Sequence, residues 1–171
     1  MKTIFILACV LMFAMACSNP GGSSGFSVGF SKGVKADFST GAKTSYTGFG
    51  IENIYVVDAE DNQLSDNELS LDSKFSIVYE GVENYTLKDG KAFPGLSIAV
   101  TDASGAYVLN ETDLFSTYTE GFDPEAASVL RGSITVGNPM QAGNSYLCKI
   151  RVFDKNSDSE IVTEMSFKVK E

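Results

Sequence analysis

Side chains with oxygen ligands gather in two turn-like stretches, and oxygen is what a hard cation such as Ca²⁺ binds. The first stretch supplies Asp58, Glu60, Asn62 and Asp66. As a calcium-binding EF-hand loop starting at Asp58, it would have Gln63 where glycine is required and Leu69 where a bidentate glutamate is required. We therefore predict solvated hairpin turns, with a Ca²⁺ site as the weaker alternative and no other cofactor.

The second stretch repeats this alternate spacing with Asp154, Asn156 and Asp158. No later acid completes a ligand set, because Met165 stands at the twelfth position. Asp, Asn and Ser are typical of turns, since their side chains hydrogen-bond to nearby backbone groups. We interpret this stretch as a turn as well.

Four aromatic side chains lie in or beside a segment without clear strand alternation: Tyr107, Phe115, Tyr118 and Phe122. Aromatic rings offer a saccharide or a peptide a flat apolar surface. A structural cap that closes one end of a folded domain would also be rich in aromatic residues. We predict such a cap, and keep a ligand-binding surface on these four residues as the alternative.

Residues suited to catalysis are scarce. The chain contains no histidine, which removes the commonest general base and the Ser-His-Asp and Cys-His arrangements. Residues 95–99 hold a serine without the Gly-x-Ser-x-Gly pattern, and Gly90 and Lys91 lack the further glycine of a phosphate-binding loop. A hydrolase built on two carboxylates stays a minor alternative. The sequence predicts a protein that is not an enzyme.

Strands must position these side chains, because apolar and polar residues alternate with period two through most of the chain. The pattern is clearest in Ser145–Asp154 and Glu160–Lys170, which a polar turn joins. Similar patterns mark 26–30, 34–38, 54–57, 69–79, 96–100, 106–109 and 129–136, whereas 39–50 and 81–94 have the composition of loops. Eight or nine short strands separated by turn signals predict an all-β fold, a sandwich of two antiparallel sheets.

Two local features modify this fold. The segment 69–79 should bend near Asp72, and a short helical insertion is expected near 112–127. There Thr112 can cap a turn of helix that ends near Tyr118, and Pro124 suits the first position of another. We expect residues 26–171 to form a single domain.

The segment from Ala142 to Asp154 resembles the penultimate strand of immunoglobulin-like domains. The resemblance implies that the Tyr146 hydroxyl hydrogen-bonds back to the preceding corner and that Cys148 points into the core. The chain has no tryptophan and no second core cysteine, so an antibody-type domain is excluded. A bacterial immunoglobulin-like sandwich is the expected fold.

The first 25 residues have the composition of an export signal and a tether. Lys2 precedes an apolar run of 13 residues, Ile4–Ala16, which is too short to span about 30 Å of hydrocarbon and typical of a signal peptide. Cys17 and a stretch rich in glycine and serine follow. This resembles a bacterial lipoprotein signal. The resemblance implies removal of residues 1–16, acylation of Cys17, a tether over 17–25 and anchoring to the outer membrane. Ordinary secretion after Ala16 is the alternative.

The net charge and the number of cysteines limit the kinds of partner that the protein can bind. The loss of Lys2 with the signal takes the net charge from −9 to about −10, which argues against nucleic acid. Cys148 then has no disulfide partner, and its apolar neighbours predict a buried thiol. We predict a lipid-anchored, non-enzymatic binding or assembly module of the cell envelope, facing the periplasm or the outside. It would bind the bilayer through Cys17 and also a protein partner or a glycan. A surface protein that captures saccharide or peptide is the alternative.

Overall fold

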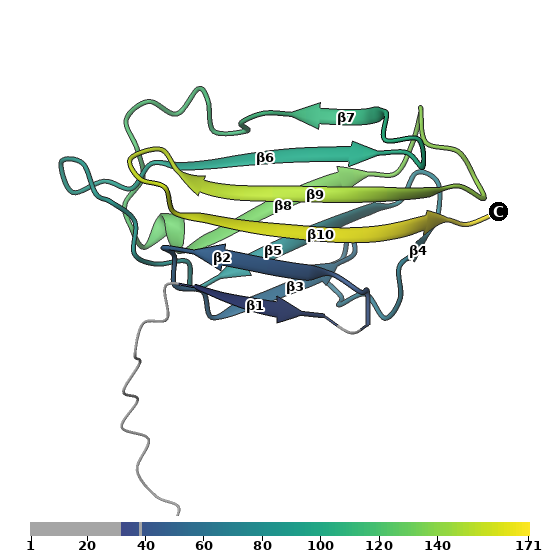
Figure 1. The fold of residues 1–171 in the computed structure, drawn as a ribbon, viewed down its shortest axis with the longest axis horizontal. Coiled ribbons are helices and arrows are strands. Elements are labelled where there is room, and N and C mark those ends of the chain that lie inside the picture. Colours follow the sequence, from purple (N-terminus) through teal and green to yellow (C-terminus); the bar gives the residue numbers. More distant parts are fainter. Residues whose placement is uncertain (1–31, 38) are drawn as a thin grey trace, which may run out of the picture.

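The structure, a computed structural model, describes residues 32–37 and 39–171 as two packed β-sheets (Figure 1). The larger sheet has the strand order β1 (Lys32–Ala36), β2 (Lys43–Thr47), β10 (Glu160–Val169), β9 (Ser145–Asp154), β6 (Pro94–Thr101) and β7 (Tyr107–Glu111). The two-residue β4 (Glu68–Leu69) joins it by parallel pairing with β10. The smaller sheet has the order β3 (Asn53–Val57), β5 (Lys74–Glu80) and β8 (Val129–Thr135). Every other pairing is antiparallel, so the predicted all-β sandwich of two antiparallel sheets is confirmed.

The hairpin of β9 and β10 lies at the centre of the larger sheet, as its alternating sequence predicts. Cys148 pairs with Met165, and both side chains are buried. Lys149 pairs with Glu164 on the opposite face, where the two form an exposed ion pair of 3.0 Å. One face of this hairpin therefore packs against the smaller sheet, and the other meets water.

The core fills the space between the two sheets. Its largest fully buried side chains include Phe49, Phe75, Ile77, Tyr79, Leu96, Ile134, Ile150, Ile161, Met165 and Phe167. They come from β5 and β8 on one side and from β6, β9 and β10 on the other, with Phe49 between β2 and β3. Burial of this apolar surface is the main favourable contribution to folding.

The Tyr146 hydroxyl accepts a hydrogen bond of 2.8 Å from the backbone N–H of Gln141. The acceptor lies on β9 and the donor in the corner before it, which is the contact that the immunoglobulin-like resemblance implies. The Tyr146 ring also stacks on Phe167 of β10, with ring centroids 5.6 Å apart. The corner is thereby fixed to the central hairpin.

The segment 39–50 contains the expected loop over 39–42, but it also contains β2, which was not predicted and which joins β1 to β10. Its inward side chains are Thr44 and Tyr46, so the segment lacks the apolar alternation that marks the other strands. The buried Thr44 hydroxyl instead lies 2.8 Å from that of Thr163 on β10. This hydrogen bond compensates the burial of both groups.

The segment 69–79, predicted as one bent strand, is two strands in different sheets. Asp72 lies between them with a φ of 62°, and its N–H donates to the Val136 carbonyl. The predicted bend is therefore in the right place, but there the chain leaves β4 of the larger sheet for β5 of the smaller one. Leu71, expected on the buried face, is exposed in this crossing.

The helix predicted from Thr112 to Tyr118 was wrong, since the structure has a series of turns there. The helical insertion shrinks to a 3₁₀ helix, η1, over Ala126–Ser128, just after Pro124. Within the described residues, no helix has the length and apolar character needed to cross a membrane. The strand predicted at 26–30, the export signal and Cys17 lie outside the described residues.

Candidate functional site

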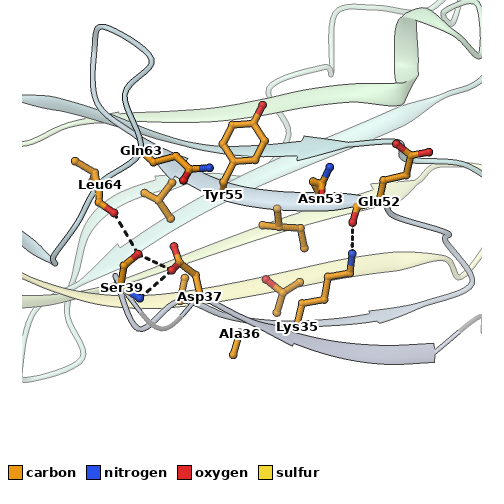
Figure 2. Close-up of a pocket in the computed structure, with 13 residues that line it drawn as sticks. Lys35, Ala36, Asp37, Ser39, Glu52, Asn53, Tyr55, Gln63 and Leu64 are labelled. Carbon is orange, nitrogen blue, oxygen red and sulfur yellow. Dashed lines mark hydrogen bonds between the residues drawn. The ribbon is translucent and has the colours of Figure 1, made fainter. Parts of the chain in front are cut away.

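A cleft of about 580 Å³ opens on one lateral side of the sandwich, between β1 of the larger sheet and β3 of the smaller one (Figure 2). Its inner walls are largely apolar and come from Ala42, Thr44, Ile54, Val56 and Leu64. Its rim is polar and includes Lys35, Asp37, Ser39, Glu52, Asn53, Tyr55 and Gln63. Its volume falls within the range of ligand-binding clefts, and so does its mixture of apolar walls with a few polar groups.

Two side-chain bridges cross the cleft, one at each end (Figure 2). At one end the Lys35 ammonium on β1 donates to the carbonyl oxygens of Ile51, at 3.0 Å, and of Glu52. At the other end the Ser39 hydroxyl oxygen lies 3.2 Å from the Leu64 carbonyl oxygen. These contacts join the two sides of the cleft and leave an open window between them.

Asp37 fixes the turn that carries Ser39. Its carboxylate accepts hydrogen bonds from the Ser39 N–H at 2.9 Å, the Ser39 hydroxyl at 2.6 Å and the Thr40 hydroxyl at 2.9 Å. Burial would raise the pKa of this carboxyl, but the hydrogen bonds from Ser39 and Thr40 outweigh it and lower the pKa below its usual value. The charged Asp37 carboxylate therefore stabilises the turn and is a poor proton donor at neutral pH.

The backbone of β3 faces the window with free hydrogen-bonding groups. The Leu64 N–H donates to the Val56 carbonyl at 2.9 Å, which shows that Val56 directs its carbonyl away from β5. Residues along an antiparallel strand alternate between the two sides, so the N–H and C=O of Ile54 also point to the open edge. Apart from the contact of Val56 with Leu64, this edge of β3 has no strand beside it among the described residues.

The face of β1 that borders the cleft is the reverse of the expected one. Alternation predicts Val34 and Ala36 inside, yet the Val34 side chain is 78% exposed and Lys35 points across the cleft. Gly33, on the inward parity, lies against the ring of Tyr46, which leaves no room for a side chain there. At the mouth of the sandwich the inward direction leads to the polar rim of the cleft, which suits a lysine better than a valine.

The four predicted aromatic residues do not form one group. Phe115, Tyr118 and Phe122 pack together at one end of the sandwich, with ring centroids 5.2 to 6.0 Å apart. Tyr107 pairs with Thr101 at the far end of β6, whereas the Leu114 N–H donates to the carbonyl of Leu96 near the start of that strand. The five residue steps from Leu96 to Thr101 correspond to about 17 Å of strand, so Tyr107 lies outside the cluster.

The aromatic cluster is fixed to the central hairpin by an ion pair. The Lys155 ammonium, in the turn between β9 and β10, lies 2.8 Å from the Asp113 carboxylate and donates to the Phe115 carbonyl at 2.8 Å. Asp113 also accepts the N–H groups of Phe115 and Leu96. Burial raises the pKa of Asp113, but these contacts together lower it below the usual value. The predicted cap over one end of the sandwich is therefore present.

The carboxylates of the acidic turns bind the backbone of their own turns. The Asp58 carboxylate accepts the backbone N–H groups of Glu60 and Asn62 at 2.9 Å, and that of Asn62 contributes most to its lowered pKa. Asp66 accepts the N–H of Glu68. In the part of the chain that the structure describes, no three Asp, Glu or Cys side chains come together as metal ligands. Asp58, Glu60, Asn62 and Asp66 are thus turn residues, as the favoured interpretation predicts.

Comparisons with known proteins leave the family open. No protein-family model matches the chain, and no curated protein matches it either. Among solved structures, the C-terminal domain of wzt is similar, with a TM-score of 0.44 and 14% identity over 72% of this chain and 74% of that one. At this level the likeness adds nothing to what the strands themselves show.

Cys148 is unsuited to chemistry. Its side chain is fully buried, and burial raises the pKa of the thiol to about 12. A nucleophilic cysteine needs a thiolate and access to solvent, and this residue has neither. The predicted role as a small buried apolar residue is confirmed.

The cleft itself was missed by sequence reasoning. Its walls come from segments interpreted as a loop, a buried strand and an acidic turn, and none of them carries a motif. The one usable signal is Lys35, a charged residue on the parity opposite to Val34 in a segment that reads as a half-buried strand.

Proposed function

We propose that this protein is a lipid-anchored, non-enzymatic binding module of the bacterial cell envelope that holds an extended peptide segment of a partner protein. The observation that carries the proposal is the free edge of β3 along the lateral cleft. Edge strands offer a row of N–H and C=O groups that a peptide can pair with, and pockets beside the edge select alternate side chains.

The geometry indicates a short segment. The bridge of Lys35 limits the open edge at Glu52, and Leu64 limits it at Val56. The four residue steps from Glu52 to Val56 span about 13 Å. The partner backbone would pair with the N–H and C=O of Ile54, and alternate side chains would enter the space lined by Ala42, Thr44 and Val56.

A non-enzymatic role is supported by the chemistry of the available side chains. The chain has no histidine, and its one cysteine among the described residues is a buried thiol. At the cleft, Asp37 has a lowered pKa, so it does not retain a proton to donate near neutral pH.

Anchoring is supported by the lipoprotein-like segment that ends at Cys17. Two or more acyl chains would give stable membrane attachment, because each buried methylene contributes about 0.8 kcal/mol. Incorporation of a labelled fatty acid into the wild-type protein, and its absence from the Cys17→Ser variant, tests this part.

Two substitutions at one position test the cleft. Ile54→Pro removes the outward N–H without removing a hydrogen bond to β5, and Ile54→Ala shortens the same side chain but keeps the N–H. A photo-crosslinking residue at Gln63 in the full chain, expressed in cells, identifies the bound segment. A synthetic peptide of that segment then measures affinity by calorimetry.

We expect Ile54→Pro to weaken peptide binding at least tenfold and Ile54→Ala to weaken it much less. Equal affinities in the two variants would contradict pairing through the backbone. A saccharide in the same cleft would instead depend on the rim amides of Asn53 and Gln63 and would tolerate Ile54→Pro. That pattern of losses would replace the peptide with a glycan.

A further inference from the structure

The end of the sandwich at which β1 begins also carries the aromatic cluster. Lys32 pairs with Thr47, which pairs with Glu160 beside the turn between β9 and β10. The same turn binds the aromatic segment, because Lys155 contacts Asp113. In Figure 1 this end is on the left, where β1 starts and where the loops before β6 and after β7 project.

Three large apolar side chains are exposed on the loops of this end. They are Leu87, at 49% exposed, Leu114, at 42%, and Tyr118, at 55%. We call them the end patch. Phe115 and Phe122 pack against Tyr118, since their ring centroids lie 6.0 and 5.2 Å from that of its ring.

The loops that carry the end patch are held in place. Asp113 is paired with Lys155, and Lys91 with Asp123 at 2.6 Å. Ala92 and Phe122 exchange two backbone hydrogen bonds of 2.8 Å. These contacts hold the loops in the arrangement that exposes the three side chains.

The length of chain before β1 indicates what covers the patch. About 15 residues join Cys17 to Lys32, and even a fully extended chain of that length spans at most about 50 Å. Because the chain enters the sandwich at the start of β1, an acylated Cys17 would keep this end within reach of the membrane. This step rests on the lipid anchor of the proposed function.

We propose that the end patch docks on the bilayer that holds Cys17, with Leu87, Leu114 and Tyr118 entering its interfacial layer. Tyrosine suits this layer, because its ring is apolar and its hydroxyl stays hydrated. Acidic residues outnumber basic ones over 83–93 and 112–125 taken together, so the contact favours neutral over anionic headgroups. The strands would then stand away from the membrane, with the lateral cleft open to the side.

The test uses the full, acylated chain in vesicles of phosphatidylcholine. Cys148 is buried, and acylation blocks Cys17, so an introduced cysteine is the one site for a thiol-reactive fluorophore. We label Tyr118→Cys and, as a second variant, Leu87→Cys. The matched control is Tyr107→Cys, a tyrosine that is 65% exposed at the opposite end of β6. The readout is quenching of the fluorophore by nitroxide groups on the lipid acyl chains.

We expect strong quenching at positions 118 and 87, little at 107, and weaker quenching at 118 and 87 when phosphatidylglycerol is added. Equal quenching at 118 and 107 in protein that sediments with the vesicles would overturn the docking and leave the anchor intact. Labelling of the native wild-type chain at Cys17 would show that the anchor itself is absent, and the docking would fall with it. Shielding of the probe at 118 in concentrated protein without vesicles would assign the patch to a second copy instead.

Discussion

The buried carboxylate of Asp154, the last residue of β9, accepts a hydrogen bond of 2.8 Å from the backbone N–H of Thr86, 68 residues earlier in the chain. The same carboxylate accepts the N–H of Asn156 at 3.1 Å and the hydroxyl of Ser157 at 2.7 Å. It therefore joins the loop before β6 to the central hairpin.

Asp154→Asn should lower the free energy of unfolding by about 2 kcal/mol, because an amide donor would replace one of these acceptors and leave a buried N–H unpaired. The midpoint of urea denaturation measures this. Asp158→Asn, an exposed change in the same turn, serves as the control and should alter stability by less than about 0.5 kcal/mol. Equal midpoints for the two variants would contradict the assignment.

The buried Tyr79 and the half-buried Tyr85 should respond differently to the loss of their hydroxyl groups. The Tyr79 hydroxyl has no hydrogen-bond partner, since the nearby Thr163 hydroxyl bonds to Thr44. The Tyr85 hydroxyl donates to the Ala127 carbonyl at 3.0 Å. Tyr79→Phe should leave stability unchanged or raise it by up to about 1 kcal/mol, whereas Tyr85→Phe should lower it by about 1 kcal/mol. Thermal unfolding of the two variants provides the comparison, and a loss in Tyr79→Phe would reveal a bond to Thr163.

Stability should fall at alkaline pH because of Cys148. Burial raises the pKa of its thiol to about 12, whereas in the unfolded chain the thiol titrates near pH 9. Between these values only the unfolded state releases the proton, so the unfolded state gains stability as pH rises through this window. At pH 10 the loss should be about 1 kcal/mol. Urea denaturation at pH 8 and 10 measures it, and Cys148→Ala should reduce the difference between the two.

Asp113 should contribute to acid sensitivity. Its pKa is lowered in the folded protein, so its contribution is complete above the unfolded pKa of 3.8 and is lost as pH falls through the lower folded value. Asp113→Asn should therefore be less stable at pH 7, by about 1 kcal/mol for this partly exposed pair with Lys155, and should lose less on acidification. Melting temperatures from pH 2 to 7 check this. Parallel curves for the two proteins would argue against the role of Asp113.

The central strands could be predicted because the alternation of apolar and polar residues within each strand shows which side chains are buried. In β9, Cys148 and Ile150 face the core while Lys149 and Arg151 face water, and this alternation depends on nothing outside the segment. The corner contact of Tyr146 was implied by the immunoglobulin-like resemblance, and its donor and acceptor lie only five residues apart.

The strands near the edges of the sheets, and the side chains that they turn inward, could not be predicted from this alternation. Lys35 faces inward because β1 is the last strand of its sheet, and only the topology determines that position. β2 was missed because Thr44 balances its burial with a hydrogen bond to Thr163, 119 residues away. The lateral cleft depends on the same long-range arrangement, since it exists only where two edge strands from different sheets come together.

Tyr107 shows a further limit of sequence distance. It lies eight residues before Phe115, yet β7 runs back along β6 between them and carries them to different parts of the molecule. Residues that are a few positions apart in an extended strand are far apart in space, because each residue adds about 3.3 Å. Only the hairpin pairing could show which aromatic side chains meet.

The direction of β10 has a practical consequence for work in living cells. It starts beside Thr47 and runs ten residues away, so Glu171 leaves the sandwich at the end opposite to Lys32 (Figure 1). A fluorescent protein or affinity tag fused after Glu171 would begin about 30 Å beyond the end patch. Such a fusion would report the position of the protein without covering the loops at the β1 end.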